Sequence, residues 1–589
     1  MAPGLQRVLL YAHTIRHLTP LQLYWRLRYR LRSGHARQYS APRPLPPVDE
    51  AAQARLRDLA RRWSAAAPPD PDRVAAFLSG RFTFLNKTVQ SSRPRWSGLD
   101  VSKLWLYHLH GFAYARDIAL LQPDPSGPEA ERVRGWMIDW AERNARPETP
   151  AWDAYPLSER LLNWSLVVSV YGWDDVLIRE RMHAQLDCLR RCLEYDLRGN
   201  HLLKNACALA AAGTLLGSPH RRTGVALLER EAAAQFLPDG GHAERSPMYH
   251  AQALADLAVL SAALDPAPGW LVRAGGGAID FLRGLLHGDG RCAQFNDGAA
   301  DEGLPALDVI ALAETCFPPP PRREGTRAWP ESGIYRIDPG GGSGLLIAKA
   351  GKAMLDSQPG HAHSDLLSFE FSVGAQRVLV NSGTHGYAES EFRNYCRGAT
   401  AHNTLQIGGR DQHEHWSVFR IARRVHAVVE AWDPAAHRLR ASYRCLHGPR
   451  HSREFAWDPR GWWRIEDTVH TREEMYVAAF LHLHPDCAVT RESGAPLPPA
   501  CSAWRIAWNG GAIVVVIAGA EAINLVSGMR APDQGWCFPQ FGVAIPAPVL
   551  IARRRVSGAG RLACAIVPEE GSVLEAARAL AGDSGGASE

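Results

Sequence analysis

The feature that most constrains the fold is an abrupt change in hydrophobic periodicity near Cys316. Up to about Thr315, apolar residues recur at spacings of three and four in segments rich in Ala, Leu and Arg, which is the pattern of amphipathic helices. Four prolines then occupy positions 318–321. Beyond them, short strand-like runs alternate with turn residues, as in antiparallel β proteins. The chain therefore predicts a helical half followed by a β half.

The length of 589 residues exceeds one ordinary hydrophobic core, so several domains are expected. Successive helices with short connections favour a bundle or helical toroid, and frequent short strands favour an antiparallel β-sandwich. The expected divisions are a basic helix and proline-rich linker in 1–50, a helical domain in 51–317, a proline-rich linker in 318–325, a sandwich in 326–581, and a disordered tail in 582–589.

Composition indicates an ordinary globular protein, since 46% of the residues are hydrophobic and 22% are charged. The sequence contains no apolar run long enough to span a membrane. The N-terminus lacks the cleavage site of a signal peptide, so we expect a cytoplasmic protein. The eleven cysteines form no CxxC pair and are expected to be mostly buried free thiols. The net charge of +5 suits an acidic substrate, and no nucleic-acid partner is expected.

The segment 21–32, LQLYWRLRYRLR, alternates apolar and basic residues. As a helix it would be a basic amphipathic segment able to touch a membrane surface or an anionic polymer. The alternative is a leading helix whose arginines are solvated or paired with the body of the protein. Both interpretations stay open at this point.

A histidine-rich stretch, Pro359–Leu405, predicts half of an active site. Residues 367–373 alternate apolar and polar side chains, as expected of a strand with one buried face. The preceding HAHSD segment follows Pro359-Gly360 and is expected to be a loop directed at a cleft. Strand pairing would bring His361, His363 and His402 together.

Two loops of the helical half carry further candidates. Asn200 and His201 precede an apolar helix, where Asn200 would serve as the N-cap. The loop 239–250 gathers acidic, basic and aromatic side chains, and its Ser246-Pro247 pair is expected to start the next helix. A glycoside hydrolase using Asp239 and Glu244 as paired carboxylates is one function that this loop would allow.

Five motifs, in their order along the chain, resemble those of the heparinase II/III family of polysaccharide lyases, which includes oligoalginate lyases. They are NHLLKNACALAAAG, PDGGHAERSPMYH, DGRCAQFNDG, HAHSDLLSFEF and RGATAHNT. The resemblance covers most of the chain from about Leu104. It implies an incomplete α/α toroid joined to an antiparallel β-sandwich, with the active site between them. It also implies β-elimination on a uronic-acid-containing polysaccharide.

The same resemblance implies catalytic roles. Asn200 and His201 would face the substrate carboxylate and stabilise the developing enolate charge. Tyr249 would be the general acid, and in some family members the matching tyrosine is also proposed as the base. A free tyrosine has a pKa of about 10, so a base role would need cationic help from His201 or Arg245. The alternative base is His361 or His201, and the tyrosine supplied by the sandwich would be Tyr387 or Tyr395.

The resemblance further implies a structural zinc, which family members often hold with two histidines and an aspartate. His363 and His402 match the histidines, whereas the aspartate position is Asn381. A neutral amide is a poorer zinc ligand than a carboxylate. The site is therefore either empty or completed by Asp365 or a water molecule.

Substrate-binding candidates are aromatic and basic residues, because aromatic faces suit sugar rings and arginine suits carboxylates. They are Trp105, His110, Trp152, Arg160, Arg245 and Arg397. For the tryptophans the alternative is interhelical packing. The expected partner is an acidic polysaccharide, and the alternatives to a lyase are the hydrolase above and a non-catalytic polysaccharide-binding protein on a degenerate lyase scaffold.

Overall fold

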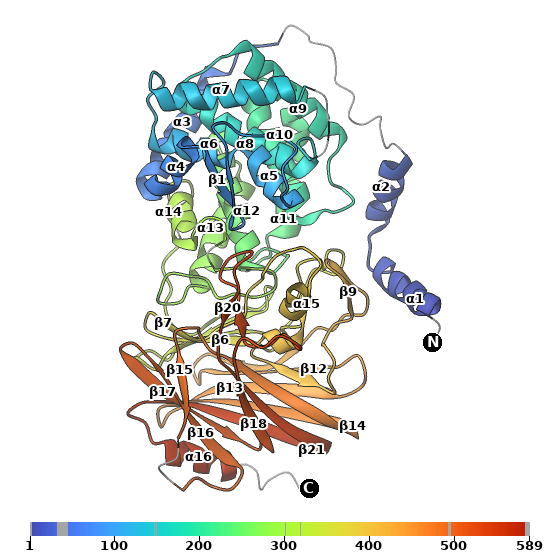
Figure 1. The fold of residues 1–589 in the computed structure, drawn as a ribbon, viewed down its shortest axis with the longest axis vertical. Helices are drawn as coiled ribbons and strands as arrows, with labels where there is room; N and C mark the ends of the chain where they lie inside the picture. The colour runs from blue at the N-terminus through green and yellow to red at the C-terminus, as the bar shows by residue number, and fades with distance from the viewer. Residues whose placement is uncertain are drawn as a thin grey trace.

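The protein is described here by a computed structural model covering residues 3–31, 45–145, 148, 150–300, 302–318, 320–492 and 496–582. A helical body stands end to end with a β domain, and two N-terminal helices lie along one flank (Figure 1). This two-part arrangement confirms the predicted helical toroid followed by an antiparallel sandwich.

The helical body surrounds one large hydrophobic core. Its helices are α3 (Glu50–Ala66), α4 (Pro71–Leu78), α5 (Lys103–Gly111), α6 (Ala113–Leu121), α7 (Pro128–Arg143), α8 (Ala154–Tyr171), α9 (Val176–Arg191), α10 (Gly199–Leu215), α11 (His220–Gln235), α12 (Pro247–Ala263), α13 (Gly269–Gly284) and α14 (Ala306–Glu314). Helices α8, α10 and α12 are buried on nearly every side. A buried helix was predicted for residues 202–216, and α10 confirms it.

Two details of the helical body were not anticipated. The helical segment 103–121 is divided into α5 and α6, because Phe112 adopts a left-handed conformation with φ of 62°. A hairpin of β1 (Arg81–Phe84) and β2 (Lys87–Gln90) also inserts between helices. Its alternate residues Phe82 and Phe84 are buried against the helical core.

The β domain contains two antiparallel sheets. The five-stranded sheet comprises β3 (Arg327–Trp329), β4 (Ile334–Ile337), β5 (Leu345–Lys349), β6 (Phe369–Val373) and β7 (Gln376–Leu379) in that order. The ten-stranded sheet comprises β11 (Val428–Asp433), β12 (Arg438–Arg444), β13 (Arg450–Asp458), β14 (Trp462–His482), β21 (Val549–Pro568), β17 (Gly511–Ala518), β16 (Cys501–Trp508) and β15 (Ala488–Arg491), with β18 (Ala522–Val526) beside β21 and β8 (Leu405–Ile407) beside β14. Apolar side chains from both sheets form one core.

Short elements complete the β domain. They are the pairs β9 (His415–Ser417) with β10 (Arg420–Ile421) and β19 (Trp536–Cys537) with β20 (Ile545–Pro546), the helices α15 (Glu391–Arg397) and α16 (Val573–Gly582), and a 3-10 turn at Ala399–Ala401. Helix α16 was not predicted. The predicted disordered tail lies outside the described residues, apart from Gly582, which ends α16.

Strand β6 corrects one expectation, because both of its faces are buried rather than one. Phe369 and Phe371 enter the sandwich core. On the opposite face, Ser372 hydrogen-bonds His287 of the helical body at 2.8 Å, and Glu370 accepts a hydrogen bond from the backbone N–H of Gln294 at 2.8 Å. The polar residues of the alternation therefore face the helical body instead of solvent.

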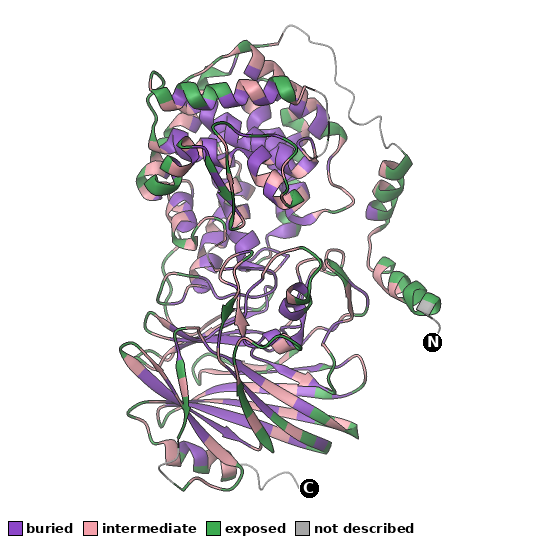
Figure 2. Cartoon of the chain, viewed as in Figure 1, coloured by how far each residue is buried: buried purple, intermediate pink, exposed green. Residues whose placement is uncertain are grey.

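The N-terminal helices α1 (Pro3–Ile15) and α2 (Pro20–Leu31) lie beside the body, and most of their surface is exposed (Figure 2). Among the described residues, no helix has the length and apolar character needed to cross a bilayer. All eleven cysteines are free thiols, seven of them buried, as predicted.

Candidate functional site

Three aromatic side chains meet where the helical body faces the sandwich. The hydroxyl oxygens of Tyr249 and Tyr387 are 2.6 Å apart, and the ring of His361 lies 4.2 Å from the ring of Tyr249, between centroids. Tyr249 is in the first turn of α12, which begins with the predicted Ser246 N-cap and Pro247. His361 is in a loop before β6, and Tyr387 follows β7. Both halves of the chain thus supply the cluster.

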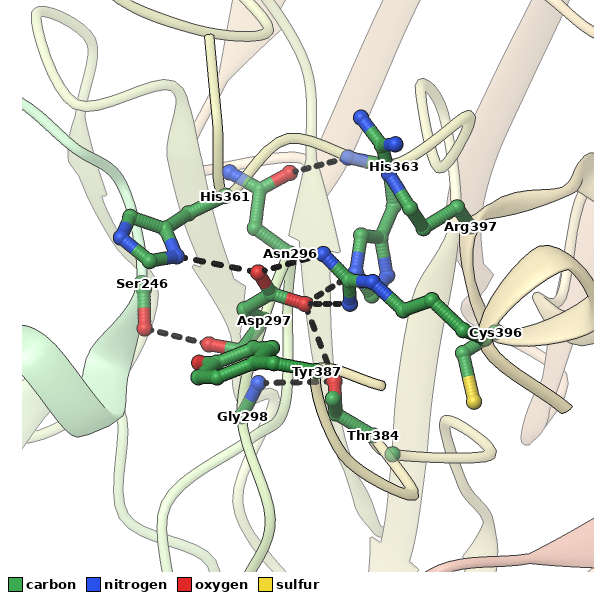
Figure 3. Close-up of polar contacts among 12 residues, drawn as sticks. Ser246, Asn296, Asp297, Gly298, His361, His363, Thr384, Tyr387, Cys396 and Arg397 are labelled. Atoms are coloured by element: carbon green, nitrogen blue, oxygen red, sulfur yellow. Dashed lines mark hydrogen bonds and ion pairs between the residues drawn. The ribbon is translucent and has the colours of Figure 1, made fainter. Parts of the chain in front are cut away.

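The buried carboxylate of Asp297 holds His361 in this cluster (Figure 3). It belongs to the helical half and accepts hydrogen bonds from His361 Nδ1 at 2.9 Å and His363 Nε2 at 2.8 Å. Both guanidinium NH groups of Arg393 also donate to it. Burial alone would raise the pKa of Asp297, but the charge of Arg393 and the two histidine hydrogen bonds lower the pKa well below its ordinary value. The carboxylate therefore stays ionised.

This contact fixes the tautomer of His361. A carboxylate only accepts hydrogen bonds, so His361 Nδ1 carries the proton and Nε2 keeps its lone pair in the neutral ring. The side chain of His361 is 11% exposed, whereas Asp297 is fully buried. His361 is thus oriented by Asp297 in the way a general base requires.

Burial also raises the pKa of the two tyrosines, and here no cation reverses the effect. It raises the pKa of Tyr249 well above its ordinary value, and the negative charge of Asp297 adds to this rise. Burial and the proximity of Tyr249 likewise raise the pKa of Tyr387. Both hydroxyls remain protonated at neutral pH, which suits proton donation and opposes a role for Tyr249 as base.

Asn200 and His201 occupy the first turn of α10. The carboxylate of Glu244 accepts hydrogen bonds from Asn200 N and from Asn200 Nδ2, both at 2.8 Å. The predicted N-cap role of Asn200 is therefore wrong: the helix starts at Gly199, and Glu244 satisfies the backbone N–H of Asn200. The Oδ1 of Asn200 is buried without a hydrogen-bond partner.

His201 Nδ1 lies 2.9 Å from Glu194 Oε1, and its ring lies 4.8 Å from that of Tyr155. Burial would lower the pKa of His201, but the charge of Glu194 and the hydrogen bond to it outweigh this effect and raise the pKa. The imidazolium form is favoured. His201 therefore suits charge neutralisation better than proton abstraction.

Hydrogen bonds of Asn381 determine which ring nitrogen of His402, one of the implied zinc ligands, carries the proton. Asn381 Oδ1 accepts from Gly383 N at 2.9 Å, so Asn381 Nδ2 donates to His402 Nδ1, also at 2.9 Å. The proton of neutral His402 then resides on Nε2, which has no lone pair for a metal. Among the described residues, no three His, Cys, Asp or Glu side chains gather in a metal-binding arrangement. These residues do not fit the implied zinc.

Asp365, the suggested substitute ligand, is already neutralised by a lysine. Lys349 forms a buried ion pair with Asp365 and donates to Asn296 Oδ1 at 2.6 Å. Asp365 also accepts from Asn296 N at 2.9 Å. Lys349 thus supplies a positive charge near His402.

Four predicted substrate-binding residues lie in the helical core instead of the cleft. Trp105 donates to Lys87 O at 2.8 Å, and Trp152 donates to Asn144 O at 3.0 Å. Arg160 is fully buried against the face of Trp140, 3.8 Å from the ring centroid, and donates to His110 O. His110 is also fully buried. The expected sugar-binding wall is corrected accordingly, since these groups satisfy one another in the core.

Of the two remaining arginine candidates, Arg245 contacts the β domain and Arg397 belongs to it. Arg245 donates to Glu331 O at 2.6 Å, and Arg397 is buried with a hydrogen bond to Ser417 O. Burial lowers the pKa of Arg397 to about 9. Tyr395, the alternative to Tyr387, is buried beside Ser382 and His482. The structure brings Tyr387, and not Tyr395, to Tyr249.

The two carboxylates proposed for a hydrolase have structural partners. Asp239 accepts from Ser332 N at 2.8 Å and from Ser332 Oγ at 2.7 Å, and Glu244 is bound to Asn200. Both join the helical body's loops to neighbouring elements. The paired-carboxylate arrangement of a glycoside hydrolase is therefore not formed by these residues.

A cavity of about 740 Å³ extends into the helical body. Two of its lining residues are close in sequence to the site. Lys204 is three residues after His201 on α10, and Gln252 is three residues after Tyr249 on α12. Residues three apart share a helix face, so the cavity adjoins the candidate site. Its charged lining comprises six carboxylates and four basic side chains: Asp70, Asp72, Asp117, Glu159, Asp256, Glu302, Arg73, Arg81, Arg116 and Lys204.

Sequence reasoning missed the residues that hold the site. Asp297, Glu194 and Arg393 were not singled out as site residues. Asp297 is separated from its partners His361 and Arg393 by 64 and 96 positions. The DGRCAQFNDG motif contained Asp297, and this was the one available signal.

Comparison with known protein families agrees with this geometry. Residues 126–266 match the family "Heparinase II/III N-terminus", and residues 321–567 match "Heparinase II/III-like, C-terminal". Together the two matches cover about two thirds of the chain.

Solved structures share the fold at low sequence identity. Heparinase III is 17% identical with a TM-score of 0.66, over 93% of this chain and 89% of that one. Heparan sulfate lyase HepC from Pedobacter heparinus is 15% identical with a TM-score of 0.55, over 93% and 87%. Chondroitinase AC lyase is 8% identical with a TM-score of 0.50, over 89% and 84%.

A curated relative comes from Caulobacter vibrioides and is named FtsZ-localized protein C. It is 25% identical over 337 residues, which are 55% of this chain and 56% of that protein. The match therefore spans little more than half of the relative's length.

Proposed function

Because the chain belongs to the heparinase II/III-like family, we propose that it is a polysaccharide lyase that cleaves a uronic-acid-containing polymer by β-elimination. One observation carries the proposal. The hydroxyls of Tyr249 and Tyr387 lie 2.6 Å apart beside His361, whose Nδ1 is held by the ionised Asp297. This places a proton donor next to an oriented base.

In the proposed reaction, His361 Nε2 removes the proton alpha to the uronate carboxylate. The electron pair forms a carbon–carbon double bond, and the bond to the glycosidic oxygen breaks. Tyr249, which its raised pKa keeps protonated, gives its phenolic proton to that oxygen. Tyr387 donates a hydrogen bond to the resulting phenolate, and transfer of the proton from His361 restores Tyr249.

The substrate carboxylate is proposed to bind at the start of α10. His201 is held cationic by Glu194, and Asn200 presents its amide at the same turn. The positive charge of His201 stabilises the developing enolate. No step in this scheme needs a metal.

The adjoining cavity bears on the choice of polymer. Its lining holds more carboxylates than basic groups, and Lys204 is paired with Asp256 at 2.8 Å and with Glu159 at 3.6 Å. Carboxylates repel sulfates and uronate carboxylates alike, so they disfavour a polymer of high charge density, but they accept hydrogen bonds from sugar hydroxyls. We therefore propose a uronate polymer with little or no sulfation.

A second candidate is a non-catalytic polysaccharide-binding protein on a lyase scaffold. Two observations favour it, namely Asn381 at the position of a zinc ligand and the similarity to a protein named for its localisation with FtsZ. Binding of an acidic polymer without turnover would distinguish it from the lyase.

The test is a panel of polysaccharides with matched assays for product. Alginate and hyaluronan represent unsulfated uronates, and heparin represents sulfated ones. A lyase produces a conjugated double bond that absorbs in the near ultraviolet, together with new chain ends. New reducing ends without absorbance would identify a hydrolase, and binding without either signal would identify the non-catalytic protein.

A further inference from the structure

The positive charge of the chain is concentrated at its N-terminus. The first 48 residues contain eight arginines and no aspartate or glutamate. Since the whole chain carries a net charge of +5, removing these eight charges leaves the remaining residues at −3. A polymer-binding cleft does not account for the arginines of α1 and α2, because these two helices lie on the flank of the molecule (Figure 1).

Helix α2 presents two different faces. Gln22, Trp25 and Tyr29 face the body: Gln22 Nε2 donates to Ser357 O at 3.0 Å, Trp25 stacks on Tyr195 at 4.7 Å, and Tyr29 donates to Leu193 O. The leucines of the opposite face recur every four residues. They are Leu23, Leu27 and Leu31, which are 41%, 60% and 77% exposed.

Helix α1 repeats this arrangement. Its docked side contacts the hairpin β9–β10, where Trp416 Nε1 donates to Thr14 Oγ1 at 3.1 Å and Arg420 lies 5.7 Å from the ring centroid of Tyr11. Leu5 and Leu9 lie one turn apart on the opposite side, with Val8 beside them, and all three are exposed. Both helices are therefore anchored to the protein by one face and show an apolar stripe on the other.

The arginines flank these stripes. About 100° separates successive residues of a helix, so Arg26 and Arg30 lie along one edge of the α2 leucines and Arg28 along the other. Arg7 of α1 and Arg16, just after its end, are exposed. Exposed apolar residues bordered by arginine, with the exposed Tyr24 beside them, are the pattern of helices that lie in the interface of an anionic membrane.

We propose that α1 and α2 form a docking surface for an anionic lipid bilayer, with the exposed leucines inserted among the acyl chains and the arginines on the lipid phosphates. This function is separate from the proposed lyase reaction. Large exposed apolar side chains distinguish a bilayer from a soluble polyanion, which would bind the arginines without covering the leucines. The positive charge of the arginines favours anionic over neutral lipid.

The test uses the full chain in a vesicle flotation assay. Vesicles of phosphatidylcholine with phosphatidylglycerol should carry the protein to the top of the gradient at low salt, and pure phosphatidylcholine vesicles should not. The variant Val8→Ser with Leu27→Ser should lose binding by roughly tenfold or more, because two exposed apolar groups no longer insert. Raising the salt concentration should also weaken binding.

A matched control is Val428→Ser with Leu525→Ser, two exposed apolar residues of the sandwich, which should bind vesicles like the unchanged protein. Equal binding to both vesicle types, or full binding by the Val8/Leu27 variant, would overturn the proposal. So would a change of oligomeric state in that variant without lipid, which would assign the helices to a second copy of the chain. Loss of dextran sulfate binding in parallel with vesicle binding would assign them to a soluble polyanion instead.

Discussion

Burial and neighbouring charges determine the protonation state of each site residue. Asp297 is kept ionised by Arg393, whereas Tyr249 and Tyr387 are kept protonated by burial. His201 is kept cationic by Glu194. These protonation states support the proposed roles of Tyr249 as proton donor and His361 as base, a choice that the residue types alone left open.

The first prediction concerns the partner of Tyr249. Tyr387→Phe removes the hydroxyl 2.6 Å from Tyr249 and is expected to lower kcat by about 10- to 100-fold with little change in KM, since the contact acts on the phenolate formed during reaction. Steady-state kinetics would measure this. Tyr395→Phe is the matched control, because Tyr395 bonds Ser382 and His482 instead. A larger loss of kcat in Tyr395→Phe would reverse the assignment.

The second prediction concerns pH. The raised pKa of His201 means that its charge is fully present below the ordinary histidine pKa and is lost as pH rises through the raised value. KM for the polymer should therefore increase on the alkaline side. In Glu194→Gln this increase should begin at lower pH, because the carboxylate that raises the pKa is gone.

Asp187→Asn provides the control for the pH experiment, since Asp187 pairs with His220 on a distant part of the helical body. Its KM profile should match that of the unchanged protein. An identical alkaline limb in Glu194→Gln would show that His201 does not bind the substrate carboxylate.

Much of the residue-level prediction was possible because the candidate side chains occur in compact motifs. Tyr249 and His361 were both singled out, and they meet in the structure. Asp297 could not be identified, because an acidic residue in a glycine-rich loop has no local signal for contacts with residues 64 and 96 positions away. Trp105 and Arg160 were misplaced because sugar-binding and core-packing residues share the same chemistry.

At the scale of elements, hydrophobic periodicity predicted the helices and strands well, and it failed where tertiary contacts decide. The alternation in β6 was recognised, but its polar face is covered by the helical body. The start of α10 was placed at an Asn200 cap, whereas a carboxylate from the distant loop at Glu244 performs that task. Burial of a polar strand face cannot be seen from the strand itself.

The third prediction concerns the loops around His363 and His402. Because Asn381 donates to His402 Nδ1 and leaves the proton on Nε2, protein purified without chelators should contain far less than one zinc per chain by elemental analysis. Asn381→Asp should raise the zinc content, since a carboxylate would accept from Nδ1–H and free the lone pair of Nε2. Stoichiometric zinc in the unchanged protein would contradict this account.

At the scale of the whole molecule, the site is also part of what joins the two halves. Asp297 comes from the helical half, and its partners His361, His363, Thr384 and Arg393 come from the β half. The same carboxylate therefore orients His361, the proposed base, and links the domains. This dual role could not be predicted from either half alone.

The fourth prediction tests this link. Asp297→Asn leaves the buried Arg393 guanidinium without its counter-ion, which is expected to cost about 3–5 kcal/mol of stability. Thermal unfolding followed by circular dichroism should show a clear decrease in Tm. Asp486→Asn, which removes a surface carboxylate near His484, should change stability by less than about 1 kcal/mol. Equal Tm values for the two variants would show that Asp297 does not stabilise the contact between the two halves.

The most direct test of the central claim compares the unchanged protein with Tyr249→Phe on a uronate polymer that the unchanged protein cleaves. Near-ultraviolet absorbance would follow product formation, and polymer binding and circular dichroism would be measured on the same samples. The account predicts that Tyr249→Phe binds the polymer and keeps its fold but forms essentially no unsaturated product, since only the proton donor is lost. Product formation by Tyr249→Phe at the rate of the unchanged protein would contradict it.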